Sequence, residues 1–322
     1  MATSGTYNYS VNLATIVRMA MLTLGKIDAH DPIDSQEYAD MVTFVNMLFK
    51  QLVGTQDDGG ALKCWNRRTG YLFLSGTQGG YSPYILNPAG GTGWTNSFVG
   101  TNTASTTVAG GNSFKVTSAA GISPLDNIGI MLDSQTIYWS VVRTVVGSTV
   151  TITGALPSQA SSGNAVYDYT TAAQLPIRLE TAVLRDAQGN DSLLRFMTRE
   201  EFMALPSKAS PTNISDPMAI YWEPQLSYSA IYADVYGCAD MTKYIVLGYM
   251  ETAQDITNPN DNPEFPQDWY LPLALGAAKL AAPMFNAPWT PVMEDNYKQA
   301  WTIAHNKDPD EVERRFFQPG DD

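Results

Sequence analysis

Residues 262–283 read Asn262-Pro263-Glu264-Phe265-Pro266-Gln267-Asp268-Trp269-Tyr270-Leu271-Pro272-Leu273-Ala274-Leu275-Gly276-Ala277-Ala278-Lys279-Leu280-Ala281-Ala282-Pro283. The first half predicts a proline-punctuated loop that delivers an aromatic side chain to the start of a helix. The second half predicts a helix whose many Ala and Gly residues allow close packing, because no bulky side chain separates its backbone from a neighbour. Nothing in the segment is typical of a catalytic site, which favours a role in assembly.

The chain on either side also predicts helices. The last helix begins at Thr290, with Pro291 in its first position, where a missing backbone N–H removes no helical hydrogen bond. Near the other end, apolar residues at helical spacing predict a helix over residues 11–26. A second helix follows after a short loop and begins with a capping box formed by Asp34 and Glu37. These two N-terminal helices are expected to form an antiparallel hairpin.

The composition changes between residues 90 and 169, where the chain is rich in Gly, Ser, Thr and Val and nearly free of charge. Short β-branched runs separated by turns predict strands of a small sandwich or barrel. Gly147-Ser148 lies between two such runs and is typical of a two-residue hairpin turn. We therefore expect an all-β domain inserted into the rest of the chain.

The expected fold class is α+β: a helical-bundle core with antiparallel strands, plus the inserted all-β sandwich or barrel. Four parts of the chain are expected. Residues 1–89 form the N-terminal part of the core, with its helical hairpin and strands, and residues 90–169 form the inserted β-domain. Residues 170–307 form the remaining strands and the C-terminal helices of the core, and residues 308–322 form a C-terminal arm.

The charge balance limits the possible partners. The chain has 322 residues with 19 Lys and Arg against 32 Asp and Glu, giving a net charge of −13. Wrapping nucleic acid requires cations that neutralise phosphates, so that function is disfavoured. An acidic surface past which DNA slides stays open, as does a charge that serves solubility alone.

Several compartments are also disfavoured. No apolar run reaches the roughly 18 residues of a membrane span, and the N-terminus does not read as a secretory signal. The two cysteines, Cys64 and Cys238, have no partner cysteines at metal spacing and are expected to be buried small hydrophobes in a reducing cytoplasm.

A search for catalytic and metal-binding patterns yields little. The run Gly90–Gly93 lacks the Gly-Lys-Ser/Thr that completes a phosphate loop. The only histidines, His30 and His305, lie far apart in the sequence. Glu200 and Glu201 fall in the first turn of a predicted helix, where acids favour capping. We expect no enzyme activity, no cofactor and no metal, although a glycosidase carboxylate pair can come from any two positions of a chain.

Two interpretations are open for one basic aromatic patch, which consists of Trp65, Arg67 and Arg68. It can contact nucleic acid by stacking and charge. Alternatively, the arginines pair with acids of the same fold or of a neighbouring subunit, since interfaces favour Arg and Trp. We keep these three residues as candidates for a partner interface.

Three segments, taken in order, resemble the head-to-tail adaptor (connector) proteins of short-tailed bacteriophages. They are the paired helices 12–53 with the strand entry at 65–71, the strand, hairpin and helix of 179–205, and the pattern Pro-x-Phe-Pro-x-x-Trp at 263–269 before two helices. The insert at 90–169 departs from the shortest adaptors. Pro272 is a second departure, because it lies where the helix should already be regular, which predicts that the helix begins at this residue.

The resemblance implies a structural virion protein that forms a dodecameric ring beneath the portal, extends the DNA channel and offers a platform for the tail nozzle or fibres. Its partners would be the portal ring, tail nozzle or fibre proteins, copies of itself, and DNA passing through the lumen without sequence-specific binding. The protein would reside in the phage neck or tail, and in the host cytoplasm during assembly. Phe265, Trp269, Phe316 and Phe317 are the further interface candidates, the last two as anchors of the C-terminal arm.

Two other functions stay open. The β-domain of 90–169 could make the chain a virion surface-binding module for carbohydrate or a host receptor. The aromatic residues Tyr138 and Trp139 suit sugar binding, although alternating strand aromatics more often belong to a core. A cell-wall hydrolase is the second alternative, against which the lack of a His-based constellation weighs.

Overall fold

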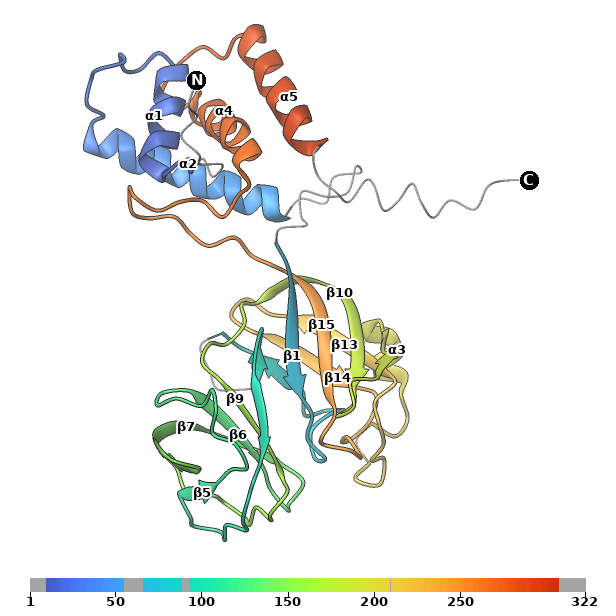
Figure 1. Cartoon of the computed structure of the whole chain (residues 1–322). Helices are drawn as coiled ribbons and strands as arrows, with labels where there is room; N and C mark the ends of the chain where they lie inside the picture. The colour runs from blue at the N-terminus through green and yellow to red at the C-terminus, as the bar shows by residue number, and fades with distance from the viewer. Residues whose placement is uncertain (1–9, 55–65, 89–92, 209, 307–322) are drawn as a thin grey trace, which may run out of the picture. The chain divides into compact units, whose positions relative to one another are not determined.

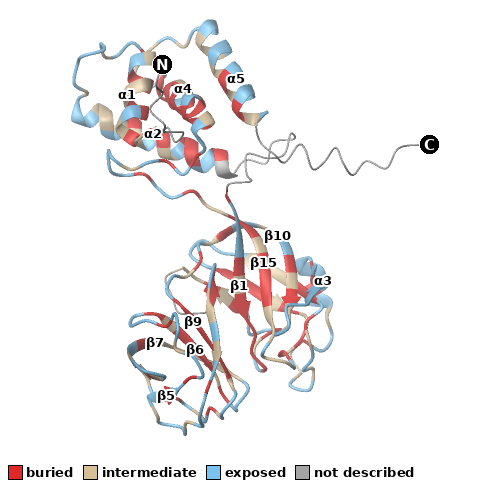
Figure 2. Cartoon of the chain, viewed as in Figure 1, coloured by how far each residue is buried: buried red, intermediate tan, exposed pale blue. Residues whose placement is uncertain are grey.

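The computed structural model describes residues 10–54, 66–88, 93–208 and 210–306. The chain forms two compact units (Figure 1): residues 1–67 together with 252–322, and residues 68–251. We call the first the helical unit and the second the β unit. Buried residues gather inside each of them (Figure 2). The fold is mixed helix and sheet and mostly β, and a helical-bundle core bearing the strands, as expected from the sequence, is not what the described residues show.

The helical unit is built from two segments that are distant in sequence. Its elements are α1 (Leu13–Thr23), α2 (Ser35–Gly54), the 3₁₀ helix η2 (Gln267–Trp269), α4 (Tyr270–Ala281) and α5 (Pro291–His305). The start of α5 is confirmed, with Thr290 as its cap and Pro291 in its first position. At the start of α2 the Asp34 carboxylate accepts the Gln36 N–H at 2.8 Å and the Glu37 N–H at 3.4 Å, but among the described residues the Glu37 side chain does not return the bond that completes the predicted capping box.

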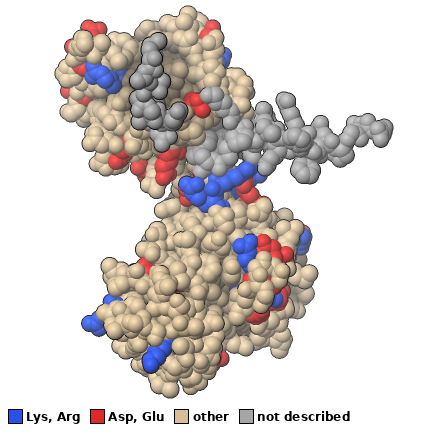
Figure 3. Space-filling view, in the orientation of Figure 1, with Lys and Arg blue, Asp and Glu red and all other residues tan. Residues whose placement is uncertain are grey.

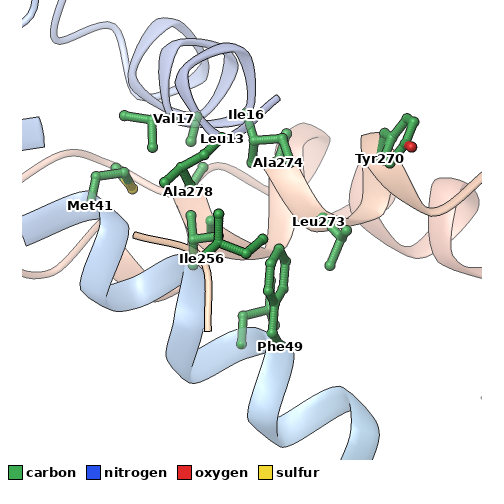
Figure 4. Close-up of a cluster of buried hydrophobic side chains, with 14 of the residues drawn as sticks. Leu13, Ile16, Val17, Met41, Phe49, Ile256, Tyr270, Leu273, Ala274 and Ala278 are labelled. Carbon is green, nitrogen blue, oxygen red and sulfur yellow. The ribbon is translucent and has the colours of Figure 1, made fainter. Parts of the chain in front are cut away.

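Helix α4 lies at the centre of this unit, because α1, α2 and α5 all pack on it. A Cβ placed on Gly276 would lie 2.9 Å from Leu48 of α2 and 3.3 Å from Tyr297 of α5, closer than packed atoms tolerate. Figure 4 shows Ala274 and Ala278 of α4 within the buried cluster of this unit. The predicted close packing of the small-residue helix is therefore confirmed.

The start of α4 differs from expectation. Pro272 is the third residue of the helix, which begins two residues earlier at Tyr270. The N–H groups of a first turn have no intrahelical acceptor, so proline fits there without losing a hydrogen bond.

Over its described residues, the β unit contains three sheets and one helix. The five-stranded sheet has the order β11 (Asp191–Leu193), β10 (Pro176–Arg185), β15 (Tyr244–Glu251), β1 (Arg67–Phe73) and β3 (Trp94–Thr95). The four-stranded sheet has the order β12 (Arg195–Phe196), β13 (Ala219–Pro224), β14 (Ser229–Ala233) and β2 (Tyr84–Leu86). The six-stranded sheet has the order β4 (Val99–Asn102), β9 (Ala165–Tyr169), β6 (Asn127–Met131), β7 (Ile137–Val146), β8 (Thr149–Ile152) and β5 (Ser113–Lys115).

The six-stranded sheet curls into a half-barrel around its own apolar cluster. Its edge strands β4 and β5 approach each other, because an antiparallel bridge joins Thr103 to Val116 just beyond their ends. The hairpin between β7 and β8 turns at Gly147, whose φ of 60° is the left-handed conformation that glycine adopts readily. The strands and the hairpin predicted within 90–169 are thus present.

Helix α3 (Arg199–Ala204) covers part of the four-stranded sheet through Phe202, whose ring stacks on Tyr221 at 5.3 Å. Its predicted capping box is confirmed: the Thr198 side chain accepts the Glu201 N–H at 3.2 Å, and the Glu201 carboxylate accepts the Thr198 N–H at 2.8 Å. Across the ranges described, no helix is both long and apolar enough to cross a membrane.

Candidate functional site

The interface candidates from the sequence do not come together in one place. Trp65, Phe316 and Phe317 lie outside the described residues. Phe265 and Trp269 are buried in the helical unit, where the Phe265 ring lies 5.0 Å from that of Phe49. Their part in a partner interface stays a prediction, and their visible role is to pack the helical unit.

Arg67 and Arg68 lie where the chain passes from the helical unit into the β unit, and we call these positions, with 251–252, the crossing between the units. Arg67 is the first residue of β1, and Arg68 Nε lies 2.7 Å from Glu251 Oε1 at the end of the neighbouring strand β15. This is the pairing within the fold that the sequence left open for Arg68. The ion pair joins the two strands through which the chain enters and leaves the β unit.

The insert aromatics pack inward. The Trp139 ring lies 5.7 Å from Phe73 and 5.5 Å from Tyr169, and it covers the sites where side chains of Gly93 and Gly129 would otherwise stand. Tyr138 packs against the apolar cluster of the half-barrel. Both rings are half-buried, and the contacts above are with other side chains of the β unit.

A different place in the β unit has the form of a binding site. A solvent-open groove of about 680 Å³ is lined by residues of five segments: 98–102, 117–118, 163–167, 186–189 and 242–244. We call it the β4–β9 groove. Its volume falls within the ~300–1,000 Å³ of pockets that hold small ligands. Strands β4 and β9 form one wall, and the turn between β10 and β11 faces them.

Three aromatic rings form the apolar part of the groove. The Phe98 ring meets the Tyr244 ring edge-on at 5.3 Å and lies 6.0 Å from that of Tyr167. Tyr167 in turn stacks on Phe73 at 4.2 Å and donates its hydroxyl to the Met241 carbonyl at 3.2 Å. Burial raises the pKa of Tyr167 above its usual value. These contacts hold the rings in fixed positions, while Phe98 and Tyr244 stay partly exposed.

Sheet register keeps the groove open. Gly100 pairs with Tyr167 and Asn102 pairs with Ala165, so these four residues share one face of the β4–β9 ladder. A Cβ on Gly100 would meet the Phe98 ring at 3.5 Å and no other described atom within 4 Å, so the glycine leaves open space beside that ring. The small residue on β4 thus helps to keep the groove open.

The polar groups of the groove fall into two sets. Thr117 donates its hydroxyl to the Asn102 carbonyl at 3.1 Å, and Thr242 donates to an Asp240 carboxylate oxygen at 2.6 Å. The side-chain amides of Asn102 and Gln188 are exposed and, among the described residues, have no hydrogen-bond partner. Each amide offers two donor hydrogens and one acceptor oxygen to a ligand.

Asp186 is the one charged residue among those that line the groove in the described part of the chain. Its carboxylate accepts the N–H groups of Gln188 at 2.9 Å and Asn190 at 2.8 Å, and the Asn190 side-chain amide at 2.9 Å. The Asn190 side-chain bond, then the backbone bonds, lower the pKa of Asp186. The carboxylate therefore shapes its own turn.

Two cations next to the groove, Arg185 and Lys243, form ion pairs with acidic residues outside its lining. The Arg185 guanidinium donates two bonds to Asp191, at 2.6 and 2.7 Å, and Lys243 pairs with Asp216. The groove thus presents aromatic rings and neutral amides. Across the described residues, no group of three or more His, Cys, Asp and Glu could hold a metal ion.

Sequence reasoning missed this site. The hairpin within residues 179–205 was predicted, but nothing in the local sequence relates its turn to residues 98–102 or to Tyr244. The five segments meet only through strand pairing, because β9 brings residues 163–167 beside β4, far from both in sequence.

The sequence matches no protein-family model and no curated protein. Solved structures that resemble the chain include the tailspike gp61 of Pseudomonas phage phi297, with 22% identity over 22% of this chain and 14% of that chain and a TM-score of 0.20. They also include the Gp54 tailspike of Acinetobacter baumannii bacteriophage AP22, solved in complex with capsular saccharide, with 19% identity over 24% of this chain and 16% of that chain and a TM-score of 0.21.

These comparisons contradict the predicted function. The structures reported are tailspikes, whereas the sequence resemblance implied a portal-to-tail adaptor, so that prediction is wrong. The connector ring, its dodecameric state and its part in DNA ejection find no support. The likeness spans a small fraction of each tailspike chain and, at these TM-scores, says nothing about what this chain binds.

Proposed function

We propose that this chain is a surface-binding protein of a bacteriophage particle and that its β4–β9 groove binds carbohydrate. The observation that supports this most directly is the combination of partly exposed aromatic rings, Phe98 and Tyr244, with two unpartnered carboxamides in one open groove. Sugar rings have apolar C–H faces and a rim of hydroxyls, and this pairing of surfaces complements both.

We propose binding rather than hydrolysis. Glycosidases use two carboxyl groups about 5–9.5 Å apart, one on each side of the scissile bond. Among the described lining residues the groove holds one carboxylate, that of Asp186, and it accepts three hydrogen bonds from its own turn. A carboxylate held in this way is poorly placed to donate or abstract a proton.

The assignment to a phage particle is supported by the phage tailspikes among the solved structures that resemble the chain. Tail proteins and further copies of the chain stay predicted partners. Mass spectrometry of purified particles of the phage that encodes this chain should detect it as a structural component, and its absence from those particles would contradict this part of the proposal.

The binding function can be tested with the fluorescently labelled full chain on a panel of bacterial strains. We expect binding to at least one strain, loss of binding after periodate oxidation of surface sugars, and no loss after protease treatment of the cells. Binding that only the protease abolishes would indicate a protein receptor. That result, or a failure to bind any strain, would overturn the carbohydrate proposal.

A further inference from the structure

We infer that the β4–β9 groove selects uncharged saccharides, with a sugar ring lying against Phe98 and Tyr244 and its hydroxyls bonded to the amides of Asn102 and Gln188. This inference rests on the proposed function and specifies the ligand class. It uses three features of the groove: the exposed part of the aromatic cluster, the unpartnered amides, and the lack of a cation for an acidic sugar.

The aromatic pair provides a rigid apolar surface. Phe98 and Tyr244 meet edge to face at 5.3 Å, and Phe98 is supported from behind by Tyr71 at 5.1 Å and Phe73 at 5.0 Å. Rings fixed by packing on one side lose little freedom when a ligand covers the other. A pyranose places several axial C–H groups on one face, which suits such a surface.

The amides provide the polar part of recognition. A sugar hydroxyl both donates and accepts, and a carboxamide does the same through its N–H₂ and C=O groups. The Thr117 and Thr242 hydroxyls donate to protein acceptors, whereas the side-chain amides of Asn102 and Gln188 have no hydrogen-bond partner among the described residues. They stand on opposite walls, Asn102 on β4 and Gln188 in the turn after β10.

The charged groups in and around the β4–β9 groove disfavour the binding of acidic sugars. A uronate or sialate carboxylate in the groove would lose hydration and find no lining cation, because Arg185 and Lys243 pair with Asp191 and Asp216. The Asp186 carboxylate would repel it, and the net charge of −13 adds to the repulsion. Figure 3 shows a largely uncharged surface on the visible face of the β unit. A neutral saccharide has no carboxylate to dehydrate, and neither Asp186 nor the net charge of the chain repels it.

Gly100 offers a selective way to close the site. It is exposed, and a Cβ there would lie 3.5 Å from the Phe98 ring, an ordinary contact. Gly100→Ala therefore fits, whereas the two methyl groups of Gly100→Val extend beyond that Cβ and take up groove space beside the Phe98 ring. β-branched residues suit strands, so the valine variant is expected to keep the fold.

The test is isothermal titration calorimetry of the full chain with neutral tetrasaccharides of glucose, galactose, mannose and N-acetylglucosamine, and with tetragalacturonate as the acidic match for galactose. We expect at least one neutral ligand to bind, and tetragalacturonate to bind at least tenfold more weakly than that ligand. Gly100→Val should weaken the neutral binding at least tenfold, while Gly100→Ala stays within threefold of the unsubstituted chain.

A second variant pair controls for general effects. Gln188→Ala should weaken neutral binding several-fold, whereas Gln225→Ala, the same change at an exposed turn outside the groove, should leave it unchanged. Matching thermal unfolding curves will show that the variants fold. Preferential binding of the uronate, or neutral binding that Gly100→Val leaves intact, would overturn the inference. Periodate-sensitive binding to bacteria without binding of any neutral tetrasaccharide would overturn it too, yet leave the proposed function standing.

Discussion

Asp168 is a buried carboxyl group next to another carboxyl group. It lies on β9, is 1% exposed, shares a hydrogen bond with Asp126, and has one oxygen without a partner among the described residues. Burial first, and then the nearby Asp126 charge, raise the pKa of Asp168 to about 8. The folded protein therefore holds a proton that the unfolded chain releases near its ordinary pKa of ~3.9.

The sign of the pH dependence follows. A raised acid pKa makes the fold most stable below the unfolded pKa, and this stability is lost as the pH rises to about 8. Asp168→Asn removes the titration, so the free energy of unfolding should no longer fall between pH 5 and pH 8. At pH 8 the free energy of unfolding of the variant should exceed that of the unsubstituted chain by on the order of 2–4 kcal/mol. Urea unfolding at several pH values measures this.

The control for this substitution is Asp295→Asn, the same chemical change at an exposed position of α5. It should leave the pH profile unchanged. A profile for Asp168→Asn that still falls as steeply as that of the unsubstituted chain would show that the carboxyl pair does not control stability in this range.

The pKa of Asp133 is shifted in the opposite direction to that of Asp168. It follows β6, and its carboxylate accepts bonds from the Ser161 hydroxyl at 2.7 Å, the Asn164 amide at 2.9 Å and the Gln159 amide at 3.0 Å. The Ser161 hydroxyl bond is the largest of the causes that lower the pKa of Asp133 to about 2. The carboxylate therefore fastens the loop before β9 to the half-barrel.

A lowered acid pKa stabilises the fold above the unfolded pKa, and that contribution is lost as the pH falls through about 2. Asp133→Ala should consequently lower the melting temperature at pH 7, and the difference from the unsubstituted chain should vanish near pH 2. Hydrogen exchange should speed up in residues 159–164 first. Equal exchange rates in both proteins would refute the fastening role of this side chain.

At the scale of elements, local patterns were sufficient where a contact lies within a few residues. The capping box of Thr198 and Glu201, the proline start of α5 and the glycine turn at 147 are short-range devices, and all three are present. Strand partners were not predictable in the same way. The turn of β10 and β11 faces the groove because β10 pairs with β15, a strand that is distant from it in sequence.

Helix α4 allows a direct test of small-residue packing. Ala277 is fully buried among the apolar side chains of the helical unit. Ala277→Leu inserts three carbon atoms where the neighbours leave no space, and it should destabilise the protein by about 1–3 kcal/mol. Ala39→Leu makes the same change at an exposed site of α2 and should alter stability by less than about 0.5 kcal/mol. Chemical unfolding of both variants gives the comparison.

Equal stabilities of the two leucine variants would mean that α4 can move away from α2 and α5. The close approach at Gly276 argues against this, because the neighbours on both of its sides are already within contact distance. An interior packed on two sides has no direction in which a larger side chain is accommodated freely.

At the scale of the whole molecule, the division of the chain follows its long-range contacts. The composition change near residue 90 marks the six-stranded sheet, but the crossing between compact units lies at residues 67–68 and 251–252. No composition change marks these positions, since β1 and β15 read like the other strands. Their pairing, and the Arg68–Glu251 ion pair beside it, become visible only in three dimensions.

The crossing leads to a prediction about independent folding. The β unit is one continuous segment whose two ends are neighbouring strands, and it contains apolar clusters of its own. A segment with adjacent ends and a complete core can fold without the chain that surrounds it. We expect residues 68–251 to unfold cooperatively as an isolated fragment and to keep the saccharide binding of the full chain.

The helical unit needs both of its segments, because α4 of the second packs on α1 and α2 of the first. Residues 1–67 alone should therefore remain largely unfolded. Circular dichroism melting of both fragments tests this, and a β fragment without a cooperative transition would show that the helical unit is required for its folding.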